Sequence, residues 1–194
     1  SKEFPWPGSR CGWIEVYNAD KDPAFARFIN TIFHQKMSEV CSTTLPQMAI
    51  PRIMSHPEYQ NYLKQRVRHY EKLSSIAYDV FKDVPYLIVN RTNGAFYMTA
   101  VFNESVLNNR QTLSIKQKEI RECVEKEVNT PIEHDKRFVY YLLGATGICV
   151  VPLTSFFTPL PGFRMTLLDK DEAEFAWVVK TIAEKIVEYI ESAK

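Results

Sequence analysis

The sequence lacks a surplus of either charge, because 24 basic and 23 acidic residues leave a net charge of +1. This balance gives no sign of electrostatic attraction to nucleic acid or to an anionic membrane. No run reaches the roughly 18 consecutive apolar residues of a membrane span, and no signal peptide opens the sequence. We therefore expect no nucleic-acid partner and no membrane partner, with the cytoplasm as the default location.

The sequence also lacks paired metal-ligand motifs. Its four cysteines lie far apart without a CxxC pair, and its four histidines show no ligand spacing. We expect buried or free thiols of a reducing compartment, with no disulfide framework and no metal site. The remaining composition, 45% apolar and 24% charged, is that of an ordinary globular protein.

The first thirteen residues contain the most informative chemistry. Lys2 offers an amine that can condense with a carbonyl, and Arg10 offers a planar fork suited to a phosphate. Gly8 and Gly12 allow a sharp turn and a close approach of the backbone to a ligand. A phosphorylated aldehyde such as pyridoxal phosphate would fit this set, whereas each cation alone is typical of a solvated surface.

The spacing Ser-Lys-x5-Gly-x-Arg-x-Gly-Trp resembles the Schiff-base signature of the class I and II pyridoxal-phosphate aminotransferases. In that family the lysine binds the cofactor and is followed by proline and glycine, and an arginine eight positions later binds the phosphate. The resemblance implies that Lys2 is catalytic and that Ser1, Lys2 and Arg10 bind pyridoxal 5'-phosphate.

A second segment, residues 147–168, resembles the family's Gly-(Val/Ile)-x-Val-x-Pro run, followed by a loop and an apolar-flanked arginine. In the family this arginine binds the α-carboxylate of the substrate, a role that the resemblance gives to Arg164. A guanidinium suits it, because it meets a carboxylate in two parallel charge-assisted hydrogen bonds. Leu153 stands where relatives usually have glycine, which affects the shape of the substrate pocket.

The resemblance implies an α/β, aminotransferase-like fold. Residues 1–56 would end the large cofactor-binding domain, residues 57–82 would form an interdomain helix, and residues 83–194 would form a small α+β domain. The family's lysine lies past the middle of a chain about twice as long, so we expect a C-terminal half. The resemblance also implies a homodimer that uses an amino acid and a 2-oxo acid as substrates.

Sequence patterns predict the elements within this frame. Alternation predicts a strand over Trp13–Tyr17, and Asp22-Pro23 predicts the start of a helix that runs to about residue 37. Branched and aromatic runs predict strands at 86–89 and 95–102, around an Asn-Gly turn. Residues 103–137 look like a polar surface insertion with a helix at 115–128. We expect Gly144 to cap one helix and Asp169 to start the last.

Three functions stay open. The first is an aminotransferase in which Lys2 moves the α-proton of the substrate. The second is another enzyme on the same scaffold, such as a decarboxylase, a carbon–sulfur lyase or an aminocyclopropane-carboxylate synthase. The third is a non-catalytic cofactor-binding module of a transcription regulator. In each case we expect the isolated 194 residues to be nearly inactive and to lack the visible absorption of a stable Schiff base.

Overall fold

The computed structural model describes residues 4–193, which divide into two compact units, one up to Leu63 and one from Lys64 onward. The domain boundaries expected after residues 56 and 82 stay a prediction. None of the helices within residues 4–193 combines the length and the apolar character needed to cross a bilayer.

The first unit consists of two 3-10 turns, η1 (Pro7–Ser9) and η2 (Ala19–Lys21), and two helices, α1 (Pro23–Met37) and α2 (Thr44–Met54). Helix α1 begins as the sequence predicts, because the Asp22 carboxylate accepts hydrogen bonds from the amides of Ala24 and Phe25 at 2.7 and 3.3 Å. The strand expected over residues 13–17 is wrong. Among the described residues no strand pairs with this segment, and Ile14 and Tyr17 are 73% and 70% exposed.

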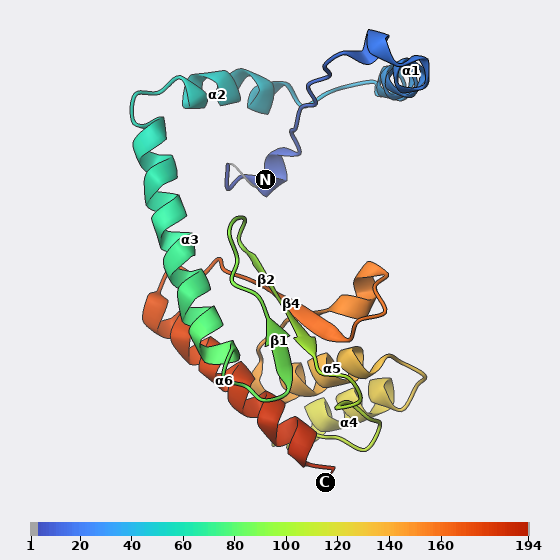
Figure 1. Cartoon of the computed structure of the whole chain (residues 1–194), viewed down its shortest axis with the longest axis vertical. Coiled ribbons are helices and arrows are strands. Elements are labelled where there is room, and N and C mark those ends of the chain that lie inside the picture. The colour runs from blue at the N-terminus through green and yellow to red at the C-terminus, as the bar shows by residue number, and fades with distance from the viewer. Residues whose placement is uncertain (1–3, 194) are drawn as a thin grey trace. The chain divides into compact units, whose positions relative to one another are not determined.

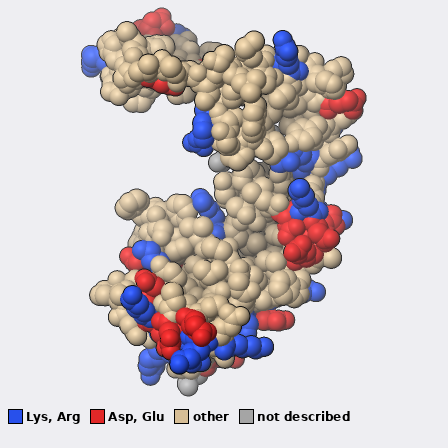
Figure 2. Space-filling model, turned by 180° about the vertical axis from the view of Figure 1, so that it is seen from behind, with Lys and Arg blue, Asp and Glu red and all other residues tan. Residues whose placement is uncertain are grey.

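This first unit has little core of its own. Its buried apolar side chains include Ile29 and Tyr59, while Phe28, Phe33 and Met48 are largely exposed. On the face seen in Figure 2, charged side chains cover only a small part of the surface over α1 and α2. Such exposed apolar surface is typical of a segment that other protein surface covers.

The second unit is built on a four-stranded antiparallel sheet with the strand order β1-β2-β4-β3 (Figure 1). The strands are β1 (Leu87–Val89), β2 (Tyr97–Phe102), β3 (Val151–Pro152) and β4 (Gly162–Thr166). The register places Thr99 and Val151 opposite Arg164, on either side of β4. The strands expected at 86–89 and 95–102 are therefore present, with shorter bounds.

Helices α3 (Tyr59–Phe81), α4 (Lys118–Val128), α5 (His134–Thr146) and α6 (Glu172–Glu191) contribute to the core beside this sheet. Side chains alternate along a strand, so Phe163 and Met165 are buried while Arg164 points to the other face. The Phe163 ring centroid lies 5.8 Å from that of Phe81 and 6.1 Å from that of Phe138. This aromatic core fixes β4, and with it the direction of Arg164.

Three details differ from the sequence-based expectations. Residues 103–137 are more than a solvated insertion, because Gln111 and Ile115 are buried. Gly147, at φ 77°, ends α5, whereas Gly144 lies within the helix. The last helix is capped by Asp171, whose carboxylate accepts hydrogen bonds from the two amides at the helix start.

Candidate active site

Arg10 is held by the turn that precedes it. Helix η1 ends at Ser9, and the next residue, Arg10, adopts the left-handed conformation with φ 48° and ψ 46°. Its backbone amide and its Nη1 both donate to the carbonyl of Pro7, at 3.3 and 3.4 Å. Lys2 and Ser1, the other residues expected at the cofactor, lie outside the described residues.

Arg10 lines a hollow of about 440 Å³ together with residues 11–13, the segment between α1 and α2, and α2 itself. Ser42 and Thr43 add hydroxyl groups to its wall, and Lys36 adds an ammonium group that pairs with Glu39 and donates to Ser42 at 3.1 Å. Among the described residues no carboxylate pairs with the guanidinium of Arg10. The Ser42 hydroxyl donates to Glu39 at 3.2 Å, so the Arg10 guanidinium and the Thr43 hydroxyl are the donors here that fit a phosphate group.

Arg164 projects from β4, one of the two inner strands of the sheet, and is half-buried. Its guanidinium carbon lies 4.7 Å from the ring centroid of Tyr97 and 4.1 Å from that of Phe156. Both distances are within the range of a cation–π interaction. Within residues 4–193 no side chain or carbonyl forms a hydrogen bond or ion pair with this guanidinium, so its N–H donors remain for a ligand.

The two arginines belong to different units, Arg10 to the first and Arg164 to the second. Within its own unit, each guanidinium has donors for its expected ligand, which is a phosphate for Arg10 and a carboxylate for Arg164. That they converge on one ligand stays a prediction.

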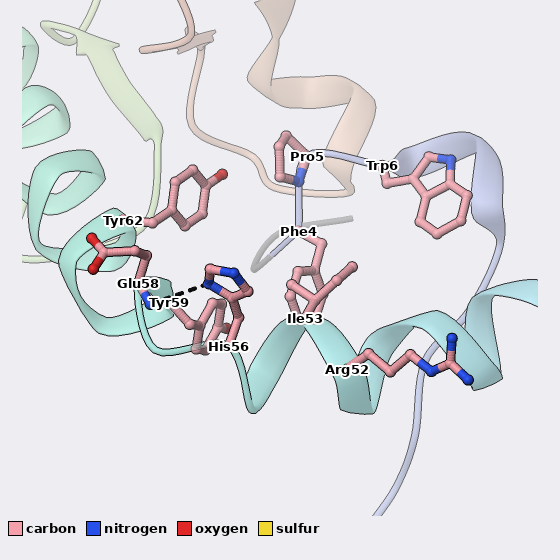
Figure 3. A pocket seen from close by; sticks show the side chains of 9 residues that line it. All are labelled: Phe4, Pro5, Trp6, Arg52, Ile53, His56, Glu58, Tyr59 and Tyr62. Atoms are coloured by element: carbon pink, nitrogen blue, oxygen red, sulfur yellow. Dashed lines mark hydrogen bonds between the residues drawn. The ribbon is translucent and has the colours of Figure 1, made fainter.

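The structure adds a hollow of about 490 Å³ that the sequence did not indicate (Figure 3). It is lined mainly by aromatic and apolar side chains from residues 4–6, from the end of α2 and from the start of α3. The rings of Phe4 and Tyr59 stack at 5.8 Å, and the Glu58 amide donates to His56 Nδ1 at 3.2 Å. The sequence feature that could have indicated this hollow is a pair of tyrosines three positions apart, Tyr59 and Tyr62, which lie on one face of a helix.

Tyr97 and Phe156 were also missed as companions of Arg164. Tyr97 belongs to an Ala-Phe-Tyr run in which any ring could have faced the core. Phe156 is followed by Phe157, and only the structure separates the ring beside Arg164 from the fully exposed one. Among residues 4–193 no group of three or more histidine, cysteine or acidic side chains could hold a metal ion.

Comparisons with known proteins assign the chain to a family. The family described as aminotransferase class I and II matches residues 1–182. An uncharacterized aminotransferase of Methanocaldococcus jannaschii is 53% identical over 192 residues, which cover 99% of this chain and 44% of that protein. A crystal structure of an aminotransferase from Escherichia coli is 17% identical with a TM-score of 0.53, over 88% of this chain and 35% of that one. The expected fold class is thus confirmed, and the chain belongs to the class I and II aminotransferase family.

Proposed function

We propose that these residues form the C-terminal part of a pyridoxal-phosphate-dependent aminotransferase that moves an amino group between an amino acid and a 2-oxo acid. Lys2 is the residue that carries the cofactor, Arg10 binds its phosphate, and Arg164 binds the α-carboxylate of the substrate. Support for a longer protein comes from the relative of M. jannaschii, of which the chain spans 44%.

One observation carries this proposal, namely the state of Arg164. A half-buried guanidinium normally pairs with a carboxylate, because an unpaired charge loses hydration without compensation. Arg164 instead lies against two rings and has no acidic partner among residues 4–193. A substrate carboxylate would supply the missing partner and be oriented by two parallel hydrogen bonds.

The chemistry of the other residues follows from their types. When bound, pyridoxal phosphate withdraws electrons from the α-carbon of the substrate. The Lys2 amine acts as general base and then as general acid for the α-proton of the substrate. Arg10 holds the phosphate through charge-assisted hydrogen bonds, helped by the hydroxyl of Thr43.

We also propose a cytoplasmic homodimer, as the family resemblance implies. The apolar surface of the first unit supports association, because Phe28, Phe33 and Met48 are exposed there. The 194 residues alone are expected to be inactive. They should not develop the visible absorption of a lysine-bound cofactor.

The test uses the full-length protein, assayed with amino acids and 2-oxo acids. Borohydride reduction followed by peptide mapping should find the cofactor attached at Lys2, and the amino group should appear on the 2-oxo acid. Turnover that releases carbon dioxide or ammonia without a 2-oxo acid would contradict the proposal and favour a decarboxylase or a lyase.

Arg164→Gln should abolish amino-acid turnover. Arg91→Gln is the matched control, because Arg91 also lies over a ring, 4.5 Å from the centroid of Tyr78, but lies near Asp79.

A further inference from the structure

We infer that Asp135 is a positioning residue for substrate binding: its buried carboxylate fixes the segment Leu153–Gly162, which holds Phe156 against the guanidinium of Arg164. The inference rests on the proposed function, because it takes Arg164 as the group that binds the α-carboxylate. It adds a residue that lies 29 positions before Arg164 in the sequence.

Asp135 is fully buried near the start of α5, with 0% of its surface exposed. Its Oδ2 accepts hydrogen bonds from the backbone amides of Thr154 and Gly162, at 3.0 and 3.2 Å. Its Oδ1 accepts from the Thr154 hydroxyl at 2.6 Å and from the Lys136 amide at 2.8 Å. One carboxylate therefore ties both ends of the 153–162 segment to helix α5.

No cation forms an ion pair with this carboxylate among the described residues. The neighbouring Lys136 ammonium pairs with Glu133 at 2.9 Å, and both of those side chains reach solvent. A buried charge without a counter-ion is costly unless hydrogen bonds compensate it. Asp135 thus depends on the donors of the 153–162 segment, and that segment depends on Asp135 for its path.

The tethered segment leads to Arg164 by two routes. The 3-10 helix η3 (Leu153–Phe156) contains Thr154 at one position and Phe156, whose ring lies beside the guanidinium, two positions later. Gly162 is the first residue of β4 and stands two positions before Arg164. No hydrogen bond or ion pair joins Asp135 to Arg164 itself, so its effect is positional.

The experiment uses the full-length protein with the cofactor bound, four new variants and the Arg164→Gln variant described above. Asp135→Asn replaces one acceptor oxygen by an N–H donor that faces other donors. Thr154→Val removes the hydroxyl bond to Asp135, and Thr154→Ser keeps it. Glu133→Gln is the control, since it removes an exposed carboxylate two positions from Asp135. The probe is the 2-methyl derivative of the best amino-acid substrate, which has the carboxylate but no α-proton.

Asp135→Asn should weaken probe binding, measured by calorimetry, by up to about 100-fold, because a misplacement of about 1 Å can cost that much. Thr154→Val should weaken it less, and Thr154→Ser and Glu133→Gln should leave it near the wild-type value. A control compound is the amine that corresponds to the substrate without its carboxylate. Because it lacks the group that Arg164 binds, it should react equally well with the Asp135→Asn protein and the wild type. Hydrogen exchange at the amides of Thr154 and Gly162 should be faster in Asp135→Asn.

The outcomes separate this inference from the proposed function. If Arg164→Gln binds the probe as tightly as the wild type, the proposed role of Arg164 is wrong. If Arg164→Gln loses the probe while Asp135→Asn and Thr154→Val keep it, the positioning role of Asp135 is wrong and the proposed function stands. Should Asp135→Asn fail to fold, the pair of Thr154 variants decides in the same way.

Discussion

Arg164 and Tyr97 lie on neighbouring strands of the sheet, with the guanidinium carbon 4.7 Å from the ring centroid. A planar guanidinium can lie against a ring and still donate hydrogen bonds at its edge. A lysine ammonium would keep the charge but would lose both the flat contact and the two-bond geometry.

Arg164→Lys should therefore weaken amino-acid turnover while the protein remains folded. Hydrogen bonds to charged groups contribute about 1.5–3 kcal/mol, so we expect kcat/KM to fall roughly 10- to 100-fold. Steady-state kinetics on the full-length protein would measure this, with Arg91→Lys as the control. Equal kcat/KM values for wild type and Arg164→Lys would contradict the assignment of Arg164 to the substrate carboxylate.

Phe156→Leu should weaken carboxylate binding modestly. The change removes a ring whose centroid lies 4.1 Å from the guanidinium carbon. Such a contact contributes about 0.5–1 kcal/mol at an exposed site, which corresponds to roughly two- to fivefold in affinity. Phe157→Leu is the matched control, because the neighbouring Phe157 is fully exposed. The same loss in both variants would mean that the loop, and not the Phe156 ring, determines the effect.

Gly162→Ala should destabilise the second unit. A Cβ at this position would clash with the carbonyl oxygen of Ala100 and come 2.7 Å from Cδ1 of Leu153. Forcing a methyl group into such a space costs about 1–3 kcal/mol or more of unfolding free energy. Urea denaturation would measure the loss, with Gly94→Ala as the control because nothing lies within 4 Å of a Cβ there. Equal unfolding midpoints for Gly162→Ala and the wild type would contradict this prediction and would mean that the strands can move apart to accept the methyl group.

Asp171 should give α6 a stability that depends on pH. Hydrogen bonds from the backbone amides of Glu174 and Ala173 lower the pKa of Asp171. The folded state therefore binds the proton less readily than the unfolded state, and the cap stabilises the fold above about pH 3.9, the usual pKa of aspartate. This stabilisation should be lost as the pH falls from there through the lower pKa of the folded state.

Thermal unfolding between pH 7 and pH 3 would check this on wild type and two variants. Asp171→Ala should melt at a lower temperature at pH 7, because both amides lose their acceptor. Asp171→Asn keeps an acceptor oxygen without a charge, so this acid-side loss should be absent. If the melting temperature falls with pH as steeply in Asp171→Asn as in wild type, the loss of stability in acid comes from groups other than Asp171.

Local chemistry made parts of the fold predictable. The cap at Asp22 and the proline after it determine the start of α1 without help from distant residues. The last helix was predicted with the wrong cap, because Asp169 and Asp171 are both suitable. The Asp169 carboxylate accepts a hydrogen bond from the Asp171 amide at 3.0 Å and forms a turn, which leaves Asp171 to cap the helix.

Features that depend on distant residues were less predictable. The residues from Trp13 to Tyr17 have the alternation of a strand, but a strand also needs a partner, and none of the described residues supplies one. At the candidate site, family motifs identified Arg10 and Arg164. They did not identify Asp135, because its partners Thr154 and Gly162 lie 19 and 27 residues away and are chosen by packing.

The two edges of the sheet are short, since β1 has three residues and β3 has two, one of them Pro152. A proline has no N–H to offer, and strands of this length present few unpaired backbone groups to another chain. Lateral growth of the sheet into a cross-β aggregate is therefore disfavoured from either side. We therefore expect any self-association of this unit in solution to use side-chain surfaces rather than strand addition.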